Sequence, residues 1–310
     1  MPTKKKPAKA RGKRPRQAMR GNGADAQPPV STCATAFRRL ATGCLAEISA
    51  NQHAAGLGQV DAVHRMRVGI TRLRAAVSFF APMTADKDWP QLKDELRWLN
   101  RALGSARDVD VVMQNLRHQR YRKLTLKGID QDLVRRSKQT RTGLSKALRS
   151  ARFQRFLASA SDWIDHGPWT ERADARLVSL QDQPIGPFCA HRIARWQKKL
   201  IRDGSELADM KEEQRHRLRI RAKRLRYMLE MLPTVCPHRH LGPFGGMEKP
   251  IKRLQRSLGD LIDLKRLRDW TKSSIVARRG QLPDGYKREK SAVLADADKA
   301  FRKMARATQQ

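Results

Sequence analysis

Two stretches of the sequence, residues 63–82 and 215–234, combine cationic and apolar side chains in the same order. In both, histidine, arginine or lysine recurs at steps of three and four residues, which places these side chains along one edge of a helix. Apolar residues recur at the same steps, mostly one position earlier, as expected for a buried helix face. The cationic positions are His64, Arg67 and Arg74 in the first stretch, His216, Arg219, Lys223 and Arg226 in the second, and, at similar spacing in a third expected helix, Arg192, Arg195 and Lys199.

Each of these rows has a chemistry that suits phosphate. Ten residues of helix rise about 15 Å, so a row can follow several phosphates of an extended chain. The planar guanidinium group of arginine donates to two phosphate oxygens at once, and a nearby anion favours the protonated form of histidine. The alternative is that the cations pair with carboxylates on adjacent helices, as they do at the flanks of helical bundles. For each histidine alone, a hydrogen-bonded packing role is an equally good interpretation.

The net charge favours phosphate binding for the rows as a whole. The 310-residue chain has 66 Lys and Arg against 30 Asp and Glu, which gives a formal charge of +36, so even complete pairing of the acids would leave a large excess of cations. Such an excess repels itself unless a polyanion or counterions screen it. We therefore expect an acidic and polymeric partner.

The two stretches are related by an offset of 152 residues, and a second pair of motifs follows in the same order. LNRALGSARDVDV begins at Leu99 and LQRSLGDLIDLKR begins at Leu254. Two matched pairs in one order predict an internal duplication. Because no segment alternates with the period of a strand, we expect an all-α fold, an internally duplicated pair of helical bundles with pseudo-two-fold symmetry. If equivalent helices face each other, the rows converge on a basic groove between the halves.

These motifs resemble those of the CHAD domain, an α-helical family named for its histidines. The matching segments are VHRMRV, TRLR and LGSARDVDV in the first half, and PIGPF, RHRLRIRAKRLRYMLE and LQRSLGDLIDL in the second. The resemblance covers roughly residues 31–305 and implies binding of inorganic polyphosphate; it also admits association with polyester storage granules. The sequence departs from the family at Thr71, where a basic residue is usual, so the first row is expected to contact its ligand less strongly.

The predicted organisation is a disordered basic tail at residues 1–29 and one domain at 30–308, with halves at about 30–180 and 181–308. The tail has nine Lys or Arg and one acid, a composition that predicts disorder and loose binding to any polyanion, nucleic acid included. In the first half, helices are expected from Ser31 to about residue 56, over 61–82, over 90–103 with an end or kink at Gly104, over 108–120, and over 129–164. In the second half they are expected over 251–258, 260–278 and 286–304.

No catalytic site, metal site or cofactor is predicted. Four scattered cysteines without a CxxC pair indicate neither zinc nor a disulfide framework, and free thiols fit a reducing cytoplasm. Asp108 and Asp110 lie two residues apart on a helix and point to different faces, so they cannot readily chelate one ion. Together with Asp260 and Asp263 they are interpreted as helix-start carboxylates that tether arginines, and Arg107 beside them could belong to the phosphate surface. The ExExK signature of the CYTH triphosphatase, a frequent neighbour of CHAD domains, is absent.

A nucleic-acid-binding protein is the strongest rival interpretation, because charge alone does not distinguish phosphate polymers. A single-strand binder would interleave aromatic residues for base stacking. Aromatics are only 5% of this chain, and Phe79, Phe80 and Tyr227 lie at or beyond the ends of the rows. We therefore predict a cytoplasmic, non-catalytic polyphosphate-binding protein without a membrane segment, which could sit on polyphosphate or other storage granules.

Overall fold

The computed structural model describes residues 31–117, 129–171, 174–273 and 285–306, and every regular element in these ranges is helical, which confirms the all-α prediction. The elements are α1 (Cys33–Ala50), α2 (Gln52–Gly56), α3 (Val60–Phe79), α4 (Ala81–Thr84), α5 (Trp89–Arg117), α6 (Ile129–Arg149), α7 (Ala151–His166), η2 (Pro168–Thr170), α8 (Ala175–Asp182), α9 (Ile185–Arg202), α10 (Glu212–Met231), η3 (Leu232–Thr234), α11 (His238–Leu241), η4 (Gly242–Met247), α12 (Glu248–Ser273) and α13 (Tyr286–Arg306). The tail predicted for residues 1–29 and the end of the helix predicted for 108–120 lie outside these ranges. Within them, no helix is long and apolar enough to cross a membrane.

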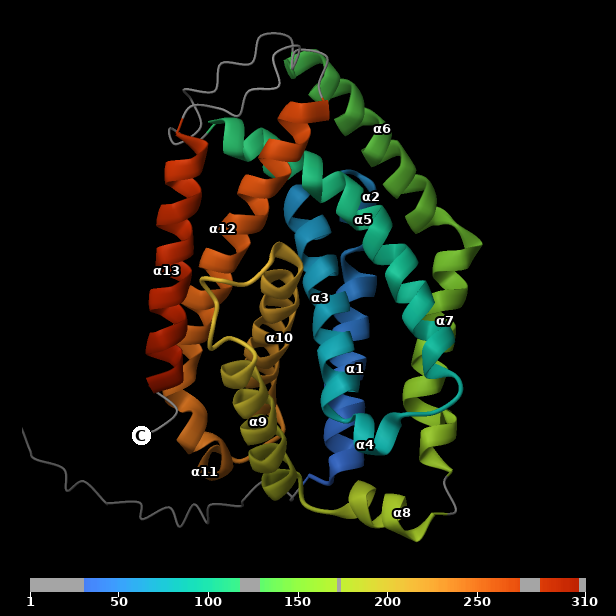
Figure 1. Cartoon of the computed structure of the whole chain (residues 1–310). Helices are drawn as coiled ribbons and strands as arrows, with labels where there is room; N and C mark the ends of the chain where they lie inside the picture. Colours follow the sequence, from blue (N-terminus) through green and yellow to red (C-terminus); the bar gives the residue numbers. More distant parts are fainter. Residues whose placement is uncertain (1–30, 118–128, 172–173, 274–284, 307–310) are drawn as a thin grey trace, which may run out of the picture. The chain divides into compact units, whose positions relative to one another are not determined.

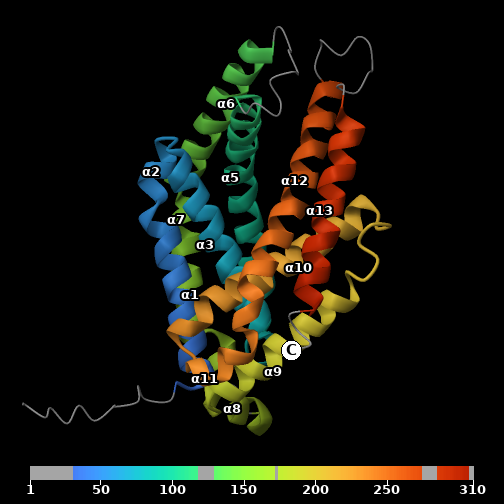
Figure 2. The ribbon, with the colours of Figure 1, turned by 90° about the vertical axis from the view of Figure 1, so that its left-hand side faces the viewer.

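Helices α3 and α10, which carry the two cationic rows, pack against each other (Figure 1 and Figure 2). α3 also packs against α1 and α5, whereas α10 packs against α9 and α12. Beyond them, α5 lies along α6, and α12 lies along α13. The two stretches singled out by sequence are therefore the helices at which the first and second halves of the chain meet.

The helices of the two halves have matching bounds. Both bounds of α9 lie 152 residues after those of α1, and both bounds of α10 lie 152 residues after those of α3. α1 and α9 also begin side by side, because Thr32 and Pro184, again 152 residues apart, form an isolated antiparallel bridge. Two backbone hydrogen bonds of 3.0 Å flank this bridge. The starts of the two helices are thus fixed to each other.

Gly104 and Gly259 lie inside continuous helices, so the helix ends predicted near them are wrong. α5 runs from Trp89 to Arg117 and α12 from Glu248 to Ser273 without interruption. An interior glycine costs a helix only about 1 kcal/mol relative to alanine. Burial of the adjacent leucines, Leu103 and Leu258, stabilises both helices at this point.

Two breaks occur where the sequence predicted continuous helix. Asn51 separates α1 from α2, and Ser150 separates α6 from α7. The hydroxyl oxygen of Ser150 accepts a hydrogen bond from the backbone N–H of Phe153 at 3.3 Å, which makes Ser150 the N-cap of α7. Thr32, and not Ser31, caps α1 in the same way. Such caps favour a new helix start because the first N–H groups of a helix have no partner within it.

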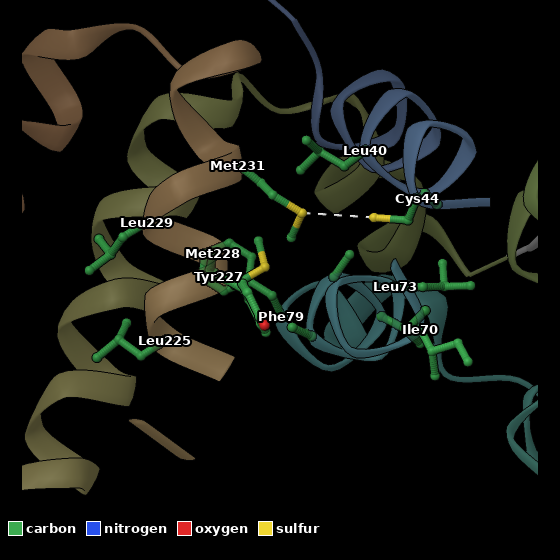
Figure 3. Packing of buried hydrophobic residues seen from close by; sticks show 14 of the residues in the cluster. Leu40, Cys44, Ile70, Leu73, Phe79, Leu225, Tyr227, Met228, Leu229 and Met231 are labelled. Carbon is green, nitrogen blue, oxygen red and sulfur yellow. Dashed lines mark hydrogen bonds between the residues drawn. The ribbon is translucent and has the colours of Figure 1, made fainter. Parts of the chain in front are cut away.

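One hydrophobic core extends across both halves of the chain. Phe188 of α9 stacks on Phe80, which directly follows α3, with ring centroids 5.3 Å apart. Elsewhere in the core, the sulfur atoms of Cys44 on α1 and Met231 on α10 lie 3.8 Å apart (Figure 3). Each half therefore buries apolar surface against the other, and the two halves share the stabilisation that this burial provides.

We predict that Gly69→Ala destabilises the protein while Gly43→Ala does not. A methyl group at Gly69 of α3 would lie 2.9 Å from Cγ1 of Ile48 and 3.3 Å from the carbonyl oxygen of Cys44 on α1, whereas one at Gly43 meets no atom within 4 Å. Overpacking should cost about 1–3 kcal/mol of unfolding free energy, and alanine at an open helical position should gain up to about 1 kcal/mol. Urea unfolding of both variants measures the two effects. Equal stability of the variants would contradict the tight contact between α1 and α3.

Candidate functional site

The cationic rows of α3 and α10 meet where Lys223 contacts Thr71. Nζ of Lys223 donates to Oγ1 of Thr71 at 3.4 Å, and the two residues hold the same place in their rows, 152 residues apart. Thr71 itself donates to the backbone carbonyl of Arg67 at 2.8 Å. Thr71 thus supplies an acceptor for Lys223, which a basic side chain at this position would not.

Arg67 and Arg219 lie against the two interior glycines. A methyl group on Gly104 of α5 would lie 3.2 Å from Nη1 of Arg67, and one on Gly259 of α12 would lie 3.7 Å from Nε of Arg219. At Gly104 a side chain would crowd the guanidinium group of Arg67, so glycine lets that group approach α5 closely. At Gly259 the distance to Arg219 is an ordinary van der Waals contact, so Arg219 does not require glycine at this position.

Arg266 of α12 connects the two halves through the acidic residues of the repeated motifs. Its guanidinium group contacts Oδ1 of Asp108 at 3.1 Å and Oδ1 of Asp263 at 3.4 Å. Asp110 lies apart from this group and pairs with Arg141 of α6 at 3.3 Å. The predicted tethering of arginines is confirmed for Asp108, Asp110 and Asp263.

The position of the aspartates within their helices corrects the other part of that interpretation. Asp108, Asp110, Asp260 and Asp263 all lie in the interior of α5 or α12, several turns from where either helix begins. They are therefore not helix-start carboxylates, because the helix dipole acts mainly within the first and last turns. In the part of the chain that the structure describes, no group of His, Cys, Asp or Glu is arranged to hold a metal ion.

Four arginines, one lysine and two histidines form a central cationic cluster, whose members are Arg67, Arg107, Arg219, Arg266, Lys223, His64 and His216. Two carboxylates, Asp108 and Asp263, interact with its guanidinium groups. Nη1 of Arg67 and Nε of Arg219 are buried without a hydrogen-bond partner among the described residues. A buried donor without a partner is unfavourable, so the cluster presents donors that an anion could satisfy.

The cluster shifts the pKa of its own bases. Burial, reinforced by the surrounding arginines, lowers the pKa of Lys223 from 10.5 to about 7. Burial and neighbouring cations also lower the pKa of His64 and of His216. A positive field disfavours further protonation, and an arriving anion would reverse this effect. The cluster is therefore set to gain protons when it binds an anion.

A cavity of about 520 Å³ opens beside the cluster between α10, α12 and α13. His216 and Arg266 lie on its wall together with Lys265 and Lys290, and Leu261 contributes apolar surface. Three carboxylates, those of Glu212, Glu213 and Asp269, also lie on this wall. The cavity opens one side of the cluster to solvent.

The two rows end in different surroundings. Nε of Arg226 donates to Oε1 of Gln255 at 2.5 Å, and the same guanidinium group pairs with Glu230. Arg74, in the equivalent place on α3, has no ion pair or hydrogen bond with another side chain among the described residues; burial and the adjacent Arg224 lower its pKa. Arg74 is thus free to bind an anion, whereas Arg226 is already engaged.

Arg192 is separated from the rest of the third row. Its buried guanidinium group donates to the backbone carbonyls of Phe79 at 2.9 Å and Ser78 at 3.1 Å, at the end of α3. It therefore satisfies carbonyl groups that a helix C-terminus leaves unpaired, which corrects its assignment to the phosphate surface. Arg195 and Lys199 are exposed, as that assignment requires.

Sequence reasoning missed two cations of this region, Arg266 and Arg224. Arg266 lies one helical turn after Asp263, and this acid–arginine spacing on one helix could have indicated it. Arg224 lies outside the periodicity of the row on α10, so no pattern on its own helix indicates it. Its relation to Arg74 emerges only when α3 and α10 are packed together.

Comparison with protein families gives one match over most of the chain. The sequence model of the CHAD domain matches residues 39–272. Two proteins of Mycobacterium tuberculosis, named uncharacterized protein MT2285 (strain CDC 1551 / Oshkosh) and uncharacterized protein Rv2226 (strain ATCC 25618 / H37Rv), are each 32% identical to this chain over 181 residues. The match covers 54% of this chain and 33% of each relative. The chain thus aligns with about one third of the length of these curated relatives.

Two solved structures share the fold. The CHAD domain from the plant Ricinus communis superimposes with a TM-score of 0.66 and 22% identity, covering 90% of this chain and 92% of that one. PptA from Streptomyces chartreusis superimposes with a TM-score of 0.62 and 14% identity, covering 90% of this chain and all of the other. At these identities the similarity establishes a common fold.

We predict that Arg192→Met lowers stability whereas Arg195→Met does not. Methionine keeps much of the length of Arg192 but leaves the carbonyls at the end of α3 unpaired, which should cost about 2–3 kcal/mol of unfolding free energy. The exposed Arg195 is the matched control on the same helix, and its replacement should change stability by less than about 0.5 kcal/mol. Denaturant unfolding compares the two variants. A similar loss in both would refute the capping role of Arg192.

Proposed function

Because the chain belongs to the CHAD domain family, we propose that it binds inorganic polyphosphate through the central cationic cluster and does not hydrolyse it. The observation that carries this proposal is the charge imbalance at the cluster. Four arginines and Lys223 share two carboxylates, and two guanidinium nitrogens are buried without partners among the described residues. Phosphate oxygens would satisfy these donors and reduce the repulsion among the cations.

We further propose that the two halves are copies related by a local two-fold axis, with the polymer bound in a basic groove between them. The matching helix bounds and the common offset of 152 residues support this arrangement. A residue on a two-fold axis contacts its own equivalent, and both Thr32–Pro184 and Thr71–Lys223 are contacts between residues 152 apart. Arg67 and Arg219, placed against equivalent glycines, would then bind the polyphosphate chain from both sides.

Binding without catalysis is supported by the way the acidic residues are used. Hydrolysis of a phosphoanhydride commonly relies on metal ions held by several carboxylates. Here Asp108 and Asp263 are occupied by Arg266, and Asp110 by Arg141. Polyphosphate binding would serve instead to place the protein on the polymer, including on polyphosphate granules.

Nucleic acid is the second candidate ligand, and the aromatic residues near the rows argue against it. Phe79 and Phe80 are fully buried in the core, and Tyr227 is 4% exposed beneath Arg226, whose guanidinium carbon lies 4.3 Å from the ring centroid. Rings that are covered in this way cannot stack on bases, and stacking is the usual means of holding single strands. We therefore expect the cluster to bind the phosphate chain and to make no use of bases.

The test is a competition at equal phosphate concentration and physiological salt, in which polyphosphate should displace single-stranded DNA and RNA. The double variant Arg219→Gln/Lys223→Gln should lower polyphosphate affinity more than tenfold and flatten the slope of log affinity against log salt by about 0.7 for each phosphate group that the variant no longer binds. Lys287→Gln/Arg288→Gln removes the same two types of cation from exposed positions on α13 and should have little effect.

Three outcomes would count against the proposal. Stronger binding of DNA or RNA would favour the nucleic-acid interpretation. Equal losses in the two double variants would mean that total charge, and not the cluster, determines affinity. Shortening of the recovered polymer in the presence of Mg²⁺ or Mn²⁺ would reject the absence of catalysis.

We also predict that polyphosphate binding takes up protons near neutral pH. The unbound protein holds Lys223 at a pKa of about 7, and a bound polyanion should raise this pKa towards its ordinary value, so affinity falls as pH rises from about 7 to 9. Calorimetry in buffers of different ionisation enthalpy measures the uptake. Lys223→Arg keeps the positive charge but does not titrate in this range, so it should bind the polymer with less proton uptake. Equal uptake by both proteins would exclude Lys223 as the source.

A further inference from the structure

The contact between α3 and α10 has two flanks whose residues correspond at the offset of 152. One, the Glu230 flank, consists of Arg72, Arg226, Glu47 and Glu230; the other, the Ser78 flank, consists of the residues in the corresponding places, Arg224, Arg74, Lys199 and Ser78. Both flanks have two arginines contributed by α3 and α10. They differ in the other two positions. The Glu230 flank has two carboxylates there, and the Ser78 flank has a lysine and a serine in the corresponding places.

The Glu230 flank is electrically neutral and closed by ion pairs. Arg72 contacts Glu47 at 3.2 Å and Glu230 at 3.7 Å, and Arg226 pairs with Glu230 as well. Both guanidinium groups also lie over the ring of Tyr227. Two carboxylates and one aromatic face thus hold two arginines. Nε of Arg72 is buried without a hydrogen-bond partner among the described residues, but the adjacent carboxylates of Glu47 and Glu230 repel an anion.

The Ser78 flank has two arginines in the corresponding places, Arg74 and Arg224, but neither has partners of this kind. Neither Arg74 nor Arg224 has an ion pair or side-chain hydrogen bond within the described ranges, and burial lowers the pKa of both. Lys199 stands where the other flank has Glu47, so it adds a positive charge where the other flank has a negative one. The replacement of Glu230 by Ser78 removes the second carboxylate and leaves a hydroxyl donor.

Three of the four side chains of this flank, all except Arg74, line a cavity of about 200 Å³ between α3, α9 and α10. Ser78, Lys199 and Arg224 line it together with Arg221 and Trp196. Arg221 is paired with Asp203. Lys199 and Arg224 are then the cations of the wall that this carboxylate does not neutralise. Trp196 packs edge to face on the buried Phe79, with ring centroids 5.3 Å apart, which makes its side of the wall rigid.

The cavity lies along the continuation of the row on α3. Arg74 follows Thr71 by about one turn of helix and Ser78 follows Arg74 by another, a rise of about 5 Å each. A phosphate chain leaving the central cationic cluster along this row would therefore reach the cavity. On the opposite side, the chain would meet Glu230 and Glu47.

We infer that the Ser78 flank is a second anion subsite, which takes a phosphate group of the same chain, so that bound polyphosphate leaves the central cluster on this flank and is excluded from the Glu230 flank. This inference rests on the proposed function. It adds Arg224, Ser78 and Arg221 to the binding surface and gives a reason for the exposure of Lys199. It also makes the two exits from the central cationic cluster unequal, whereas two equivalent rows alone would let the polymer leave on either flank.

The test exchanges the residues that distinguish the flanks in the full-length protein. Ser78→Glu should pair with Arg74 and Arg224 and weaken binding of long-chain polyphosphate roughly threefold to tenfold at 0.15 M salt, with a flatter salt slope. Glu230→Ser should remove the ion pair of Arg226 and leave Arg72 with Glu47 alone, so affinity and slope should change in the opposite direction. Tripolyphosphate, which is too short to span both the cluster and the cavity, should bind the Ser78→Glu variant and the unmodified protein alike.

A second pair of variants keeps the inference testable if Ser78→Glu disturbs the end of α3. Arg224→Gln removes a cation from the cavity without adding bulk, and Arg72→Gln is its counterpart on the Glu230 flank. Long-chain affinity should fall in the first and stay within about twofold in the second, where the arginine is already neutralised. Equal effects of the two would overturn the inference while leaving the proposed function intact. Failure of the unmodified protein to bind polyphosphate would instead overturn the proposed function.

Discussion

Packing α3 against α10 brings two rows of cations into one another's field, and much of the surrounding structure compensates for that repulsion. Lys223 is held among arginines with burial pressing its pKa to about 7. Asp108 and Asp263 neutralise part of the charge through Arg266. The core supplies the opposing stabilisation, because stacked rings such as Phe80 and Phe188 join the halves at the end of α3. Polyphosphate would act as the missing counter-charge, and a ligand that binds only the folded state stabilises that state.

The periodicity of the sequence predicted the helices and the rows well because both depend on local spacing. Val63, Met66 and Leu73 are buried, and the cationic positions beside them lie on one edge of α3, as a repeat of 3.6 residues requires. Predicted helix boundaries were wrong at glycine, because a glycine can either end a helix or allow another side chain to approach the helix closely. Gly104 resembles a helix end in sequence, yet it serves the close approach of Arg67 from another helix. Information about that approach is absent from the local sequence of α5.

The candidate site could be predicted only as far as single helices determine it. His64, Arg67, His216, Arg219 and Lys223 were found from their spacing. Arg192 has the same spacing, but its guanidinium group donates to backbone carbonyls at the end of α3 and is not available to a ligand. The different fates of Arg74 and Arg226 can be read within each helix, because Glu230 follows Arg226 by four residues on α10 whereas Ser78 holds that place after Arg74 on α3. Tertiary packing decides the fate of Arg192, and local spacing decides that of Arg226.

The hydrogen bond between Lys223 and Thr71 has a consequence for the origin of the fold. Under the proposed duplication, an ancestral chain of half this length would have associated as a symmetric dimer, and a two-fold axis places each axial residue opposite a second copy of itself. Two lysines there would repel, and two threonines would supply no cation. Covalent joining of the copies removes this constraint, because each copy can then change alone. A fused chain can therefore have lysine opposite threonine, and serine on one flank with glutamate on the other. A homodimer cannot, because its equivalent positions carry the same residue.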